Sequence, residues 1–153
     1  MYTCTKEYLT GFSAVFRQWR ADSHCRLLHG YGLQFKIVFE AETLDDSNWV
    51  YDFGSLKELK NVLESTFDHK TVIAVDDPEI ETFKALADKG ILELVTVPNV
   101  GVEAFARFVF GYADSIVKKN AGTRVKVRSV EVRENLGNSA TFENPDCFAC
   151  LVR

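Results

Sequence analysis

LQFKIVFE, residues 33–40, places an apolar side chain at every odd-numbered position and a polar one at three of the four even-numbered positions. Successive side chains of a β-strand point to opposite faces of a sheet, so this alternation predicts a strand with one buried face. The pattern extends in both directions and predicts a strand over Leu28–Glu42, the strongest strand signal in the chain.

Three further segments are typical of strands that pair with this one or with each other. Residues 2–17 are rich in Tyr, Thr, Phe and Val, with a break expected near Gly11. Residues 125–132 alternate again, and Ala140–Glu143 follows a turn at 135–139 that is typical of a hairpin. The sequence therefore predicts two antiparallel hairpins, one at each end of the chain, and a weaker strand over Ile91–Val97.

Helical signals lie between the two hairpins. Ser55 and Glu58 have the spacing of a capping box, which predicts a helix that ends near Phe67. Residues 78–90 predict a short helix, and Val102–Lys119 a second long one. We expect a single α+β domain over residues 1–153, with a four-stranded antiparallel sheet, two long helices on one face, and an extra tail after about residue 144.

Composition limits the possible partners and location. The 153 residues are 46% hydrophobic and carry a formal net charge of −4, which gives no electrostatic basis for binding nucleic acid or an anionic membrane. No apolar stretch approaches the roughly 20 residues that span a bilayer, and the N-terminus lacks a signal-peptide pattern. We expect a cytoplasmic protein with reduced thiols. Cys147 and Cys150 form a CxxC pair, for which a frayed tail is favoured over a redox or zinc role.

Two short motifs carry groups suited to proton transfer at neutral pH. Residues 25–31, Cys-Arg-Leu-Leu-His-Gly-Tyr, contain a thiol and an imidazole, and Asp68-His69 adds a carboxylate and a second imidazole. Each group also has an ordinary structural interpretation. Cys25 could be a small buried hydrophobe, His29 a core histidine bonded to a backbone carbonyl, and Asp68 the cap of a turn.

Six segments in order resemble the 6-pyruvoyltetrahydropterin synthase and 6-carboxytetrahydropterin synthase family, which has the tunnelling fold. The resemblance runs from about Tyr8 to Asn144. The segments are Phe12-Ser13-Ala14-Val15-Phe16, the Cys25–Tyr31 motif, Asp52-Phe53, Phe67-Asp68-His69, Gly101-Val102-Glu103 and Val130-Glu131-Val132-Arg133-Glu134.

The resemblance implies an activity and an assembly. Family members act on 7,8-dihydroneopterin triphosphate, remove the triphosphate and remodel the pterin side chain by proton transfer. Cys25 matches the cysteine that deprotonates carbon, and Asp68 with His69 matches the proton relay. Glu134 matches the carboxylate that grips the pterin edge, and Glu103 an acidic position that opens the second long helix. Two stacked trimers, with sites between subunits, are implied, so we expect a homo-hexamer.

The family's zinc centre departs most from this chain. The resemblance implies three histidine ligands, of which His29 matches the second, while Phe16 and Tyr31 stand at the other two positions. A catalytic zinc normally keeps three protein ligands, so we predict no metal and no other cofactor here. Phe16 and Tyr31 are expected to fill the space that the metal occupies in the family, and His24 is the alternative ligand.

Three hypotheses remain. The first is a homologue that binds a pterin-like ligand in a site without a normal zinc cage, with altered lyase or aldolase chemistry. The second is a conventional zinc-dependent synthase with substitute ligands such as His24. The third is a non-catalytic protein that keeps the barrel-forming fold alone. The sequence leaves the substrate, the reaction and a role for Cys147 and Cys150 open.

Overall fold

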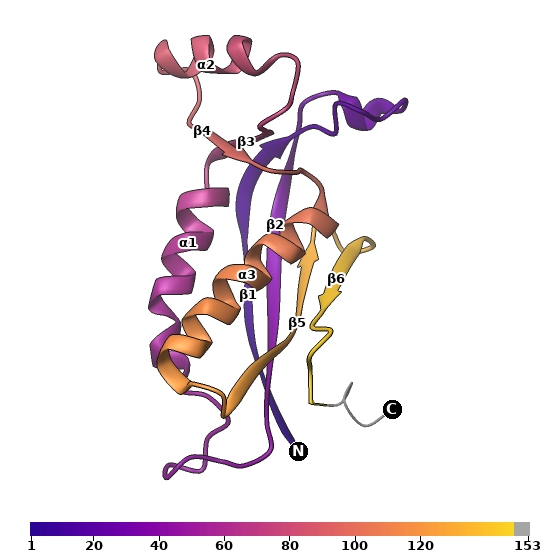
Figure 1. The fold of residues 1–153 in the computed structure, drawn as a ribbon. Helices are drawn as coiled ribbons and strands as arrows, with labels where there is room; N and C mark the ends of the chain where they lie inside the picture. Colours follow the sequence, from indigo (N-terminus) through magenta and orange to yellow (C-terminus); the bar gives the residue numbers. More distant parts are fainter. Residues whose placement is uncertain (149–153) are drawn as a thin grey trace.

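A computed structural model of the chain describes residues 1–148, and they form one mixed β-sheet with helices packed against it (Figure 1). The strands lie in the order β4-β3-β1-β2-β5-β6. Their bounds are β1 Tyr2–Phe16, β2 His29–Ala41, β3 Lys70–Ala74, β4 Leu94–Val97, β5 Val125–Arg133 and β6 Ser139–Glu143. The helices are α1 Lys57–Phe67, α2 Ile80–Asp88 and α3 Val102–Ala121, with 3₁₀ turns at His24–Arg26 and Phe53–Leu56.

The expected α+β class is confirmed, and the expected sheet is corrected. β1–β2, β2–β5 and β5–β6 are antiparallel, as the two predicted hairpins require. β3 and β4 extend this sheet to six strands; β3 pairs in parallel with β1, and β4 pairs in parallel with β3. The four-stranded, purely antiparallel description was wrong because residues 70–74 are a short apolar run without alternation, which periodicity alone does not identify as a strand.

The odd-numbered face of β2 forms the centre of the core. Leu33, Phe35, Ile37 and Phe39 are at most 1% exposed. They face α1 and α3, which lie against the same side of the sheet in Figure 1. Phe67, at the end of α1, lies 5.1 Å from the Phe35 ring centre. The alternation in the sequence therefore predicted the buried face correctly.

Gly11 marks a β-bulge, where the sequence predicted a break. The pairing of β1 with β2 shifts register between Tyr8 and Phe12, and Gly11 has φ +73°. Glycine adopts this left-handed conformation without the Cβ clash that other residues meet. Beyond the bulge, Ala14–Phe16 pairs with β3 as well as β2, so this end of β1 lies inside the sheet.

The predicted cap of the first long helix was wrong. Asp52, not Ser55, supplies the side-chain acceptor, since its Oδ1 accepts the Gly54 N–H at 2.8 Å. This bond closes the 3₁₀ turn at Phe53–Leu56, and α1 begins after it without a side-chain cap. Both Asp and Ser are good capping residues, so spacing alone chose between them incorrectly.

The Cys147–Cys150 segment was expected to fray, but residues 144–148, which include Cys147, pack against the sheet. The Asn144 N–H donates to the Arg128 carbonyl at 2.8 Å, and the Phe148 N–H donates to Glu40 Oε1 at 2.5 Å. Cys147 is 2% exposed, whereas Cys150 lies outside the described residues.

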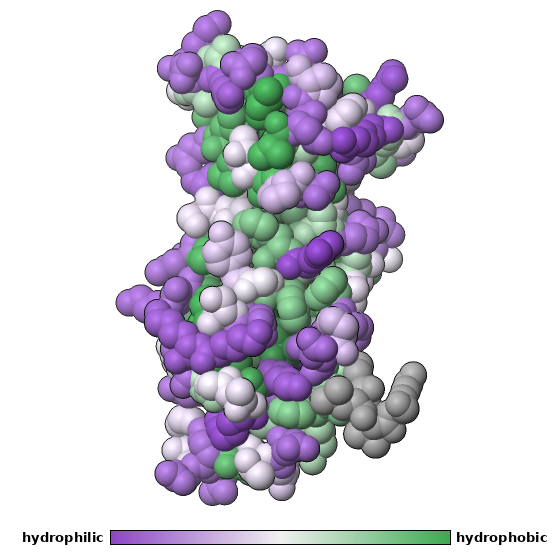
Figure 2. Space-filling model, in the orientation of Figure 1, coloured by the Kyte–Doolittle hydropathy of each residue, from purple (hydrophilic) through white to green (hydrophobic). Residues whose placement is uncertain are grey.

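The molecular surface is mixed in polarity. In Figure 2 hydrophilic residues surround apolar ones, and an apolar group is visible in the upper part, where Figure 1 places α2 and the nearby strand ends. In the described part of the chain, no helix has the length and apolar character needed to cross a membrane.

Candidate functional site

Three of the positions singled out in the sequence share one face of the sheet where β1 ends and β2 begins. Phe16 pairs with His29, and Ala14 pairs with Tyr31. Side chains directly opposite in an antiparallel pair lie on the same face, as do residues two apart on one strand. This face is the helix side, because the Phe16 ring meets the Phe105 ring of α3 at 5.0 Å.

His29 uses both ring nitrogens. Nδ1 lies 2.6 Å from the Leu27 carbonyl oxygen, and Nε2 lies 2.5 Å from the Tyr31 hydroxyl. A carbonyl oxygen only accepts, so Nδ1 carries the proton; in the neutral imidazole Nε2 is then the acceptor and Tyr31 donates to it. The expected bond from His29 to a backbone carbonyl is confirmed.

Tyr31 has a ring contact and a polar contact. Its ring stacks on Phe16 with centroids 4.7 Å apart, consistent with the predicted filling role. Burial raises the pKa of its hydroxyl, and negative charge on Glu134 and Cys25 raises it further. The hydroxyl therefore stays protonated at neutral pH and lies within electrostatic range of both groups. This polar role of Tyr31 was not predicted, although the His-x-Tyr spacing on a strand was the available signal.

Cys25 and Glu134, the two groups whose charge acts on Tyr31, come from two different segments. Cys25 is half-buried in the turn at His24–Arg26, where its N–H donates to Ser23 Oγ at 3.3 Å. Glu134 directly follows β5, and its Oε1 accepts from Asn138 Nδ2 at 3.0 Å. Both groups act electrostatically on the Tyr31 hydroxyl, and no hydrogen bond joins either of them to it within residues 1–148.

Asp68 and His69 lie on the other side of β1. Asp68 Oδ1 accepts the Ser13 N–H at 3.2 Å and lies 3.1 Å from His69 Nδ1. His69 has φ +57°, and its side chain is 82% exposed. The next residue, Lys70, pairs with Ala14, which in turn pairs with Tyr31. Two strand spacings, about 10 Å, therefore separate the relay from Tyr31.

Glu103 stands apart from the other predicted site residues. It is exposed in the first turn of α3 and lines a cavity of about 680 Å³ together with Arg107 and Phe108. Within residues 1–148, no hydrogen bond or ion pair joins Glu103 to Cys25 or to His69. The sequence placed Glu103 correctly at the start of a helix, but it did not determine which residues surround the Glu103 carboxylate.

The donors at the three expected ligand positions do not fit a zinc centre. Phe16 offers no donor atom, and both nitrogens of His29 are bonded to other groups. His24 is exposed, and the described residues contain no group of three His, Cys, Asp or Glu side chains that could hold a metal ion. Zinc prefers a tetrahedral set of imidazole, thiolate or carboxylate ligands, which this arrangement does not present.

A second large cavity, of about 540 Å³, lies at the opposite end of β1 and was not predicted. Its lining combines the start of β1 with the loop before α1 and includes Cys4, Trp49, Tyr51 and Phe53. Trp49 and Phe53 are 53% and 41% exposed. The signal in the sequence was the aromatic cluster at 49–53, which periodicity does not interpret.

Comparisons with known proteins point to one protein family. Residues 3–145 match the family described as 6-pyruvoyl tetrahydropterin synthase. A 6-carboxy-5,6,7,8-tetrahydropterin synthase of Aquifex aeolicus is 28% identical over 130 residues, 83% of this chain and 80% of that protein. The corresponding protein of Rickettsia typhi is 33% identical over 81 residues, which are 52% of this chain and 57% of the relative.

Solved structures agree on the fold. An uncharacterized protein from Wolinella succinogenes has a TM-score of 0.81 at 24% identity, covering 94% of this chain and 98% of that one. A 6-pyruvoyl tetrahydropterin synthase from Plasmodium vivax has a TM-score of 0.64 at 15% identity, covering 94% and 99%. With its six-stranded sheet, its two long helices on one face and a match from residue 3 to residue 145, this chain belongs to the 6-pyruvoyl tetrahydropterin synthase family.

Proposed function

We propose that this protein binds a pterin-like ligand of the 7,8-dihydroneopterin triphosphate class in a site that has no normal zinc cage. Any reaction it performs on the ligand side chain is then a lyase or aldolase type of proton transfer by Cys25, Asp68 and His69. We place it in the cytoplasm, where these thiols stay reduced.

One observation carries the proposal. The Tyr31 hydroxyl donates to His29 Nε2, while His29 Nδ1 donates to the Leu27 carbonyl. Both imidazole nitrogens are therefore satisfied by the protein, and Tyr31 supplies a hydroxyl that Cys25 and Glu134 influence electrostatically. Metal loss costs the family reaction several kcal/mol of transition-state stabilisation, but the groups that bind a ligand edge and move protons remain.

Glu134 is the proposed anchor for the ligand. A carboxylate accepts two hydrogen bonds from the paired N–H groups of a pterin edge, and such charge-assisted bidentate contacts are the stronger class of hydrogen bond. Glu134 is half-buried, and its Oε1 is held by Asn138 at 3.0 Å. A held, half-buried carboxylate keeps its direction before the ligand arrives, which lowers the entropy cost of binding.

The remaining groups suit cleavage or rearrangement of the side chain. In a retro-aldol step, the base takes the proton of the side-chain hydroxyl next to the scissile bond. The carbon–carbon bond then breaks, an aldehyde leaves, and the electron pair on the pterin side is protonated by the acid. We assign the base to Cys25 and the acid to the Asp68–His69 pair, whose Oδ1 and Nδ1 are 3.1 Å apart.

Open sheet edges support assembly into a homo-hexamer. Only Ala14–Phe16 of β1 pairs with β3, and β6 pairs with β5 alone among the described strands. The earlier part of β1 and the outer side of β6 thus keep unpaired backbone groups, which proteins usually cover by further pairing.

The proposal is tested by metal analysis of the purified protein together with calorimetric titration of 7,8-dihydroneopterin, its triphosphate and a purine nucleotide. We expect binding of the pterins with less than stoichiometric zinc. Glu134→Gln should weaken pterin binding by about 10- to 100-fold, since it removes a charge-assisted contact of about 1.5–3 kcal/mol. Glu143→Gln, an exposed carboxylate on β6, is the matched control and should leave binding unchanged.

Stoichiometric zinc with release of triphosphate would overturn the proposal in favour of a conventional synthase. In that case His24→Ala should abolish both metal and turnover. Failure to bind any pterin or purine, by an intact oligomer, would instead support a non-catalytic protein that keeps only the fold.

A further inference from the structure

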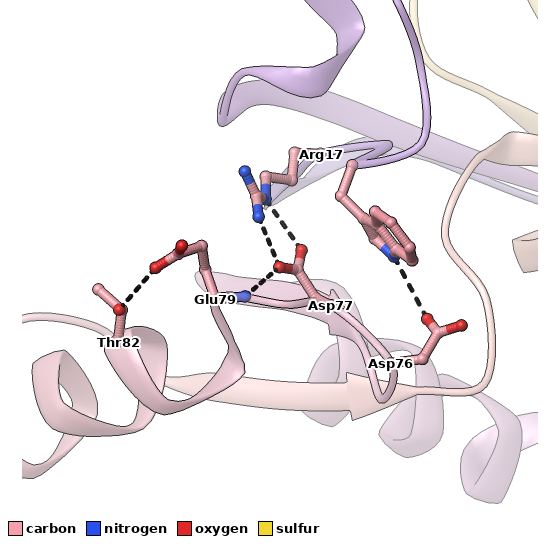
Figure 3. Close-up of polar contacts among 6 residues, drawn as sticks. Arg17, Asp76, Asp77, Glu79 and Thr82 are labelled. Atoms are coloured by element: carbon pink, nitrogen blue, oxygen red, sulfur yellow. Dashed lines mark hydrogen bonds and ion pairs between the residues drawn. The ribbon is translucent and has the colours of Figure 1, made fainter.

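A buried ion pair joins the end of β1 to the turn before α2 (Figure 3). Arg17 donates from Nε to Asp77 Oδ2 at 2.9 Å and from Nη2 to Asp77 Oδ1 at 2.5 Å. The Asp77 side chain is fully buried, and that of Arg17 is 18% exposed. The guanidinium also lies 5.6 Å from the ring centre of Phe83, a buried residue of α2. Two parallel bonds of this kind fix orientation as well as distance.

Asp77 is itself held in place by the start of α2. Its Oδ1 accepts the Glu79 N–H at 2.8 Å, and its carbonyl accepts the Ile80 N–H at 3.0 Å. Glu79 in turn accepts from the Thr82 hydroxyl at 2.8 Å, as Figure 3 shows. The carboxylate that receives Arg17 therefore has a set direction relative to α2.

The next three residues after Arg17 add separate attachments. Trp19 Nε1 donates to Asp76 Oδ1 at 3.3 Å, and Arg20 Nη2 donates to Asp76 Oδ2 at 2.5 Å. Gln18 Nε2 donates to the Val100 carbonyl at 3.2 Å, just before α3. All four residues from 17 to 20 thus bond to the segments around α2 or α3.

This attachment extends to Cys25 through Gln18. Residues 17–28, the Cys25 loop, connect β1 to β2. The Gln18 N–H donates to the Cys25 carbonyl at 2.9 Å, so the two sides of the loop are tied together at the residue that carries the thiol. Arg17 is covalently bonded to Gln18, and Gln18 is hydrogen-bonded to Cys25. A movement of Arg17 away from Asp77 would therefore also displace Cys25.

We propose that Arg17 and Asp77 are positioning residues, which hold the Cys25 loop, and with it the Cys25 thiol, in one place where β1 ends and β2 begins. This inference rests on the proposed function, in which Cys25 is the reactive thiol. The α2 segment, which contributes none of the predicted site residues, then serves as the anchor of the loop.

The chemistry of the pair favours positioning over stability alone. An apolar pair of similar size often stabilises a fold as well as a buried ion pair does, because two charges must lose their water. What an ion pair with two hydrogen bonds adds is a single geometry. A loop that must present a thiol at one place needs that property more than it needs binding energy.

The test follows the alkylation rate of individual cysteines in the full-length protein by mass spectrometry of the peptides that carry Cys25 and Cys4. Cys4 lies near the start of β1, and its thiol is partly buried, so it reports on the fold as a whole. The variants are Asp77→Asn and Arg17→Gln. The matched control is Asp114→Asn, which breaks an ion pair within α3 between the partly buried Asp114 and the exposed Lys118.

We expect both variants to alkylate Cys25 about threefold faster or more, as a locally released loop does, with the Cys4 rate unchanged. Arg17→Lys keeps the charge and fewer hydrogen bonds, and should give a smaller change than Arg17→Gln. A Cys25 rate equal to that of the unmodified protein, or equal acceleration at Cys4 and Cys25, would overturn the proposal.

Alkylation of the cysteines by iodoacetamide needs no pterin, so the alkylation rates can be interpreted whether or not the protein binds pterins. If the protein binds pterins, Asp77→Asn should also weaken turnover more than binding, because it displaces the thiol and leaves Glu134 in place. If it binds none, the proposed function fails while the alkylation result still decides whether the ion pair positions the loop.

Discussion

Replacing Phe16 and Tyr31 together by histidine should create a zinc site in this protein. The register pairs residue 16 with residue 29, and residues 29 and 31 are two apart on β2, so three imidazoles would point from one face. Loss of Tyr31 also frees His29 Nε2, which now accepts the tyrosine hydroxyl at 2.5 Å. The double variant therefore tests both the shared face and the reason that the present donors do not fit zinc.

The magnitude follows from the contacts that change. Without metal, the variant loses the Phe16–Tyr31 stack, worth about 0.5–1.5 kcal/mol, and the Tyr31–His29 hydrogen bond, worth about 0.5–1.5 kcal/mol. The free energy of unfolding should fall by about 1–3 kcal/mol before zinc is added. Zinc at about 100 times its Kd returns about 2.7 kcal/mol. For a domain of this size, that gain raises Tm by about 5–11 °C.

The assay is thermal unfolding with and without zinc, supported by metal analysis after dialysis. The unmodified protein and the Tyr31→His single variant serve as controls, and neither should gain Tm with zinc. A zinc-dependent rise in the Tm of the unmodified protein would refute this prediction. A folded double variant that takes up no zinc would refute it as well, because the three positions then do not share a face.

Three further changes test other parts of the structure. Tyr31→Phe keeps the ring stack but removes the donor to His29, so Tm should fall by about 1–6 °C, since one hydrogen bond is worth about 0.5–1.5 kcal/mol; no change in a melting curve would contradict that bond. Gly11→Ala forces a Cβ into φ +73° and should lower the free energy of unfolding, measured by urea titration, by about 1–2 kcal/mol. An unchanged free energy of unfolding would argue against the β-bulge at Gly11. Burial alone would raise the pKa of Asp77, but hydrogen bonds from Arg17 and the Glu79 N–H hold it below its ordinary value of 3.8. The charge-dependent part of its contribution to stability is therefore complete above pH 3.8 and is lost as pH falls through the lowered pKa. Asp77→Asn should be less stable at pH 6 by about 1.5–3 kcal/mol, the range for hydrogen bonds to a charged group; a difference in stability that does not narrow toward pH 3 would argue against this ion pair.

The sequence predicted the parts of the fold that local periodicity controls. Leu33 and Phe35 are buried because alternation on a strand necessarily puts them on one face, and Gly11 breaks β1 because only glycine adopts its conformation easily. β3 was missed because Val72 and Ile73 belong to a short apolar run whose pairing with β1 is decided by tertiary contacts. Such pairing across α1 has no local signature in the chain.

The candidate site was predictable to a similar extent. The bond from His29 to a backbone carbonyl was expected, but the partner of its other nitrogen was not, because the Tyr31 hydroxyl was treated as part of an apolar filler. The attachment of the Cys25 loop was also missed. Arg17 and Asp77 are 60 residues apart, and only the folded sheet brings them together.

The docking of residues 144–148 has a practical consequence for anyone who shortens this protein. The family match ends at residue 145, yet the Phe148 N–H still donates to Glu40 Oε1. Glu40 is fully buried, and among the described residues its Oε2 has no hydrogen-bond partner. A version cut at the family boundary would therefore lose the Phe148 N–H, the one backbone donor that residues 1–148 give to this buried carboxylate, and expression should keep at least three residues more than the domain boundary suggests.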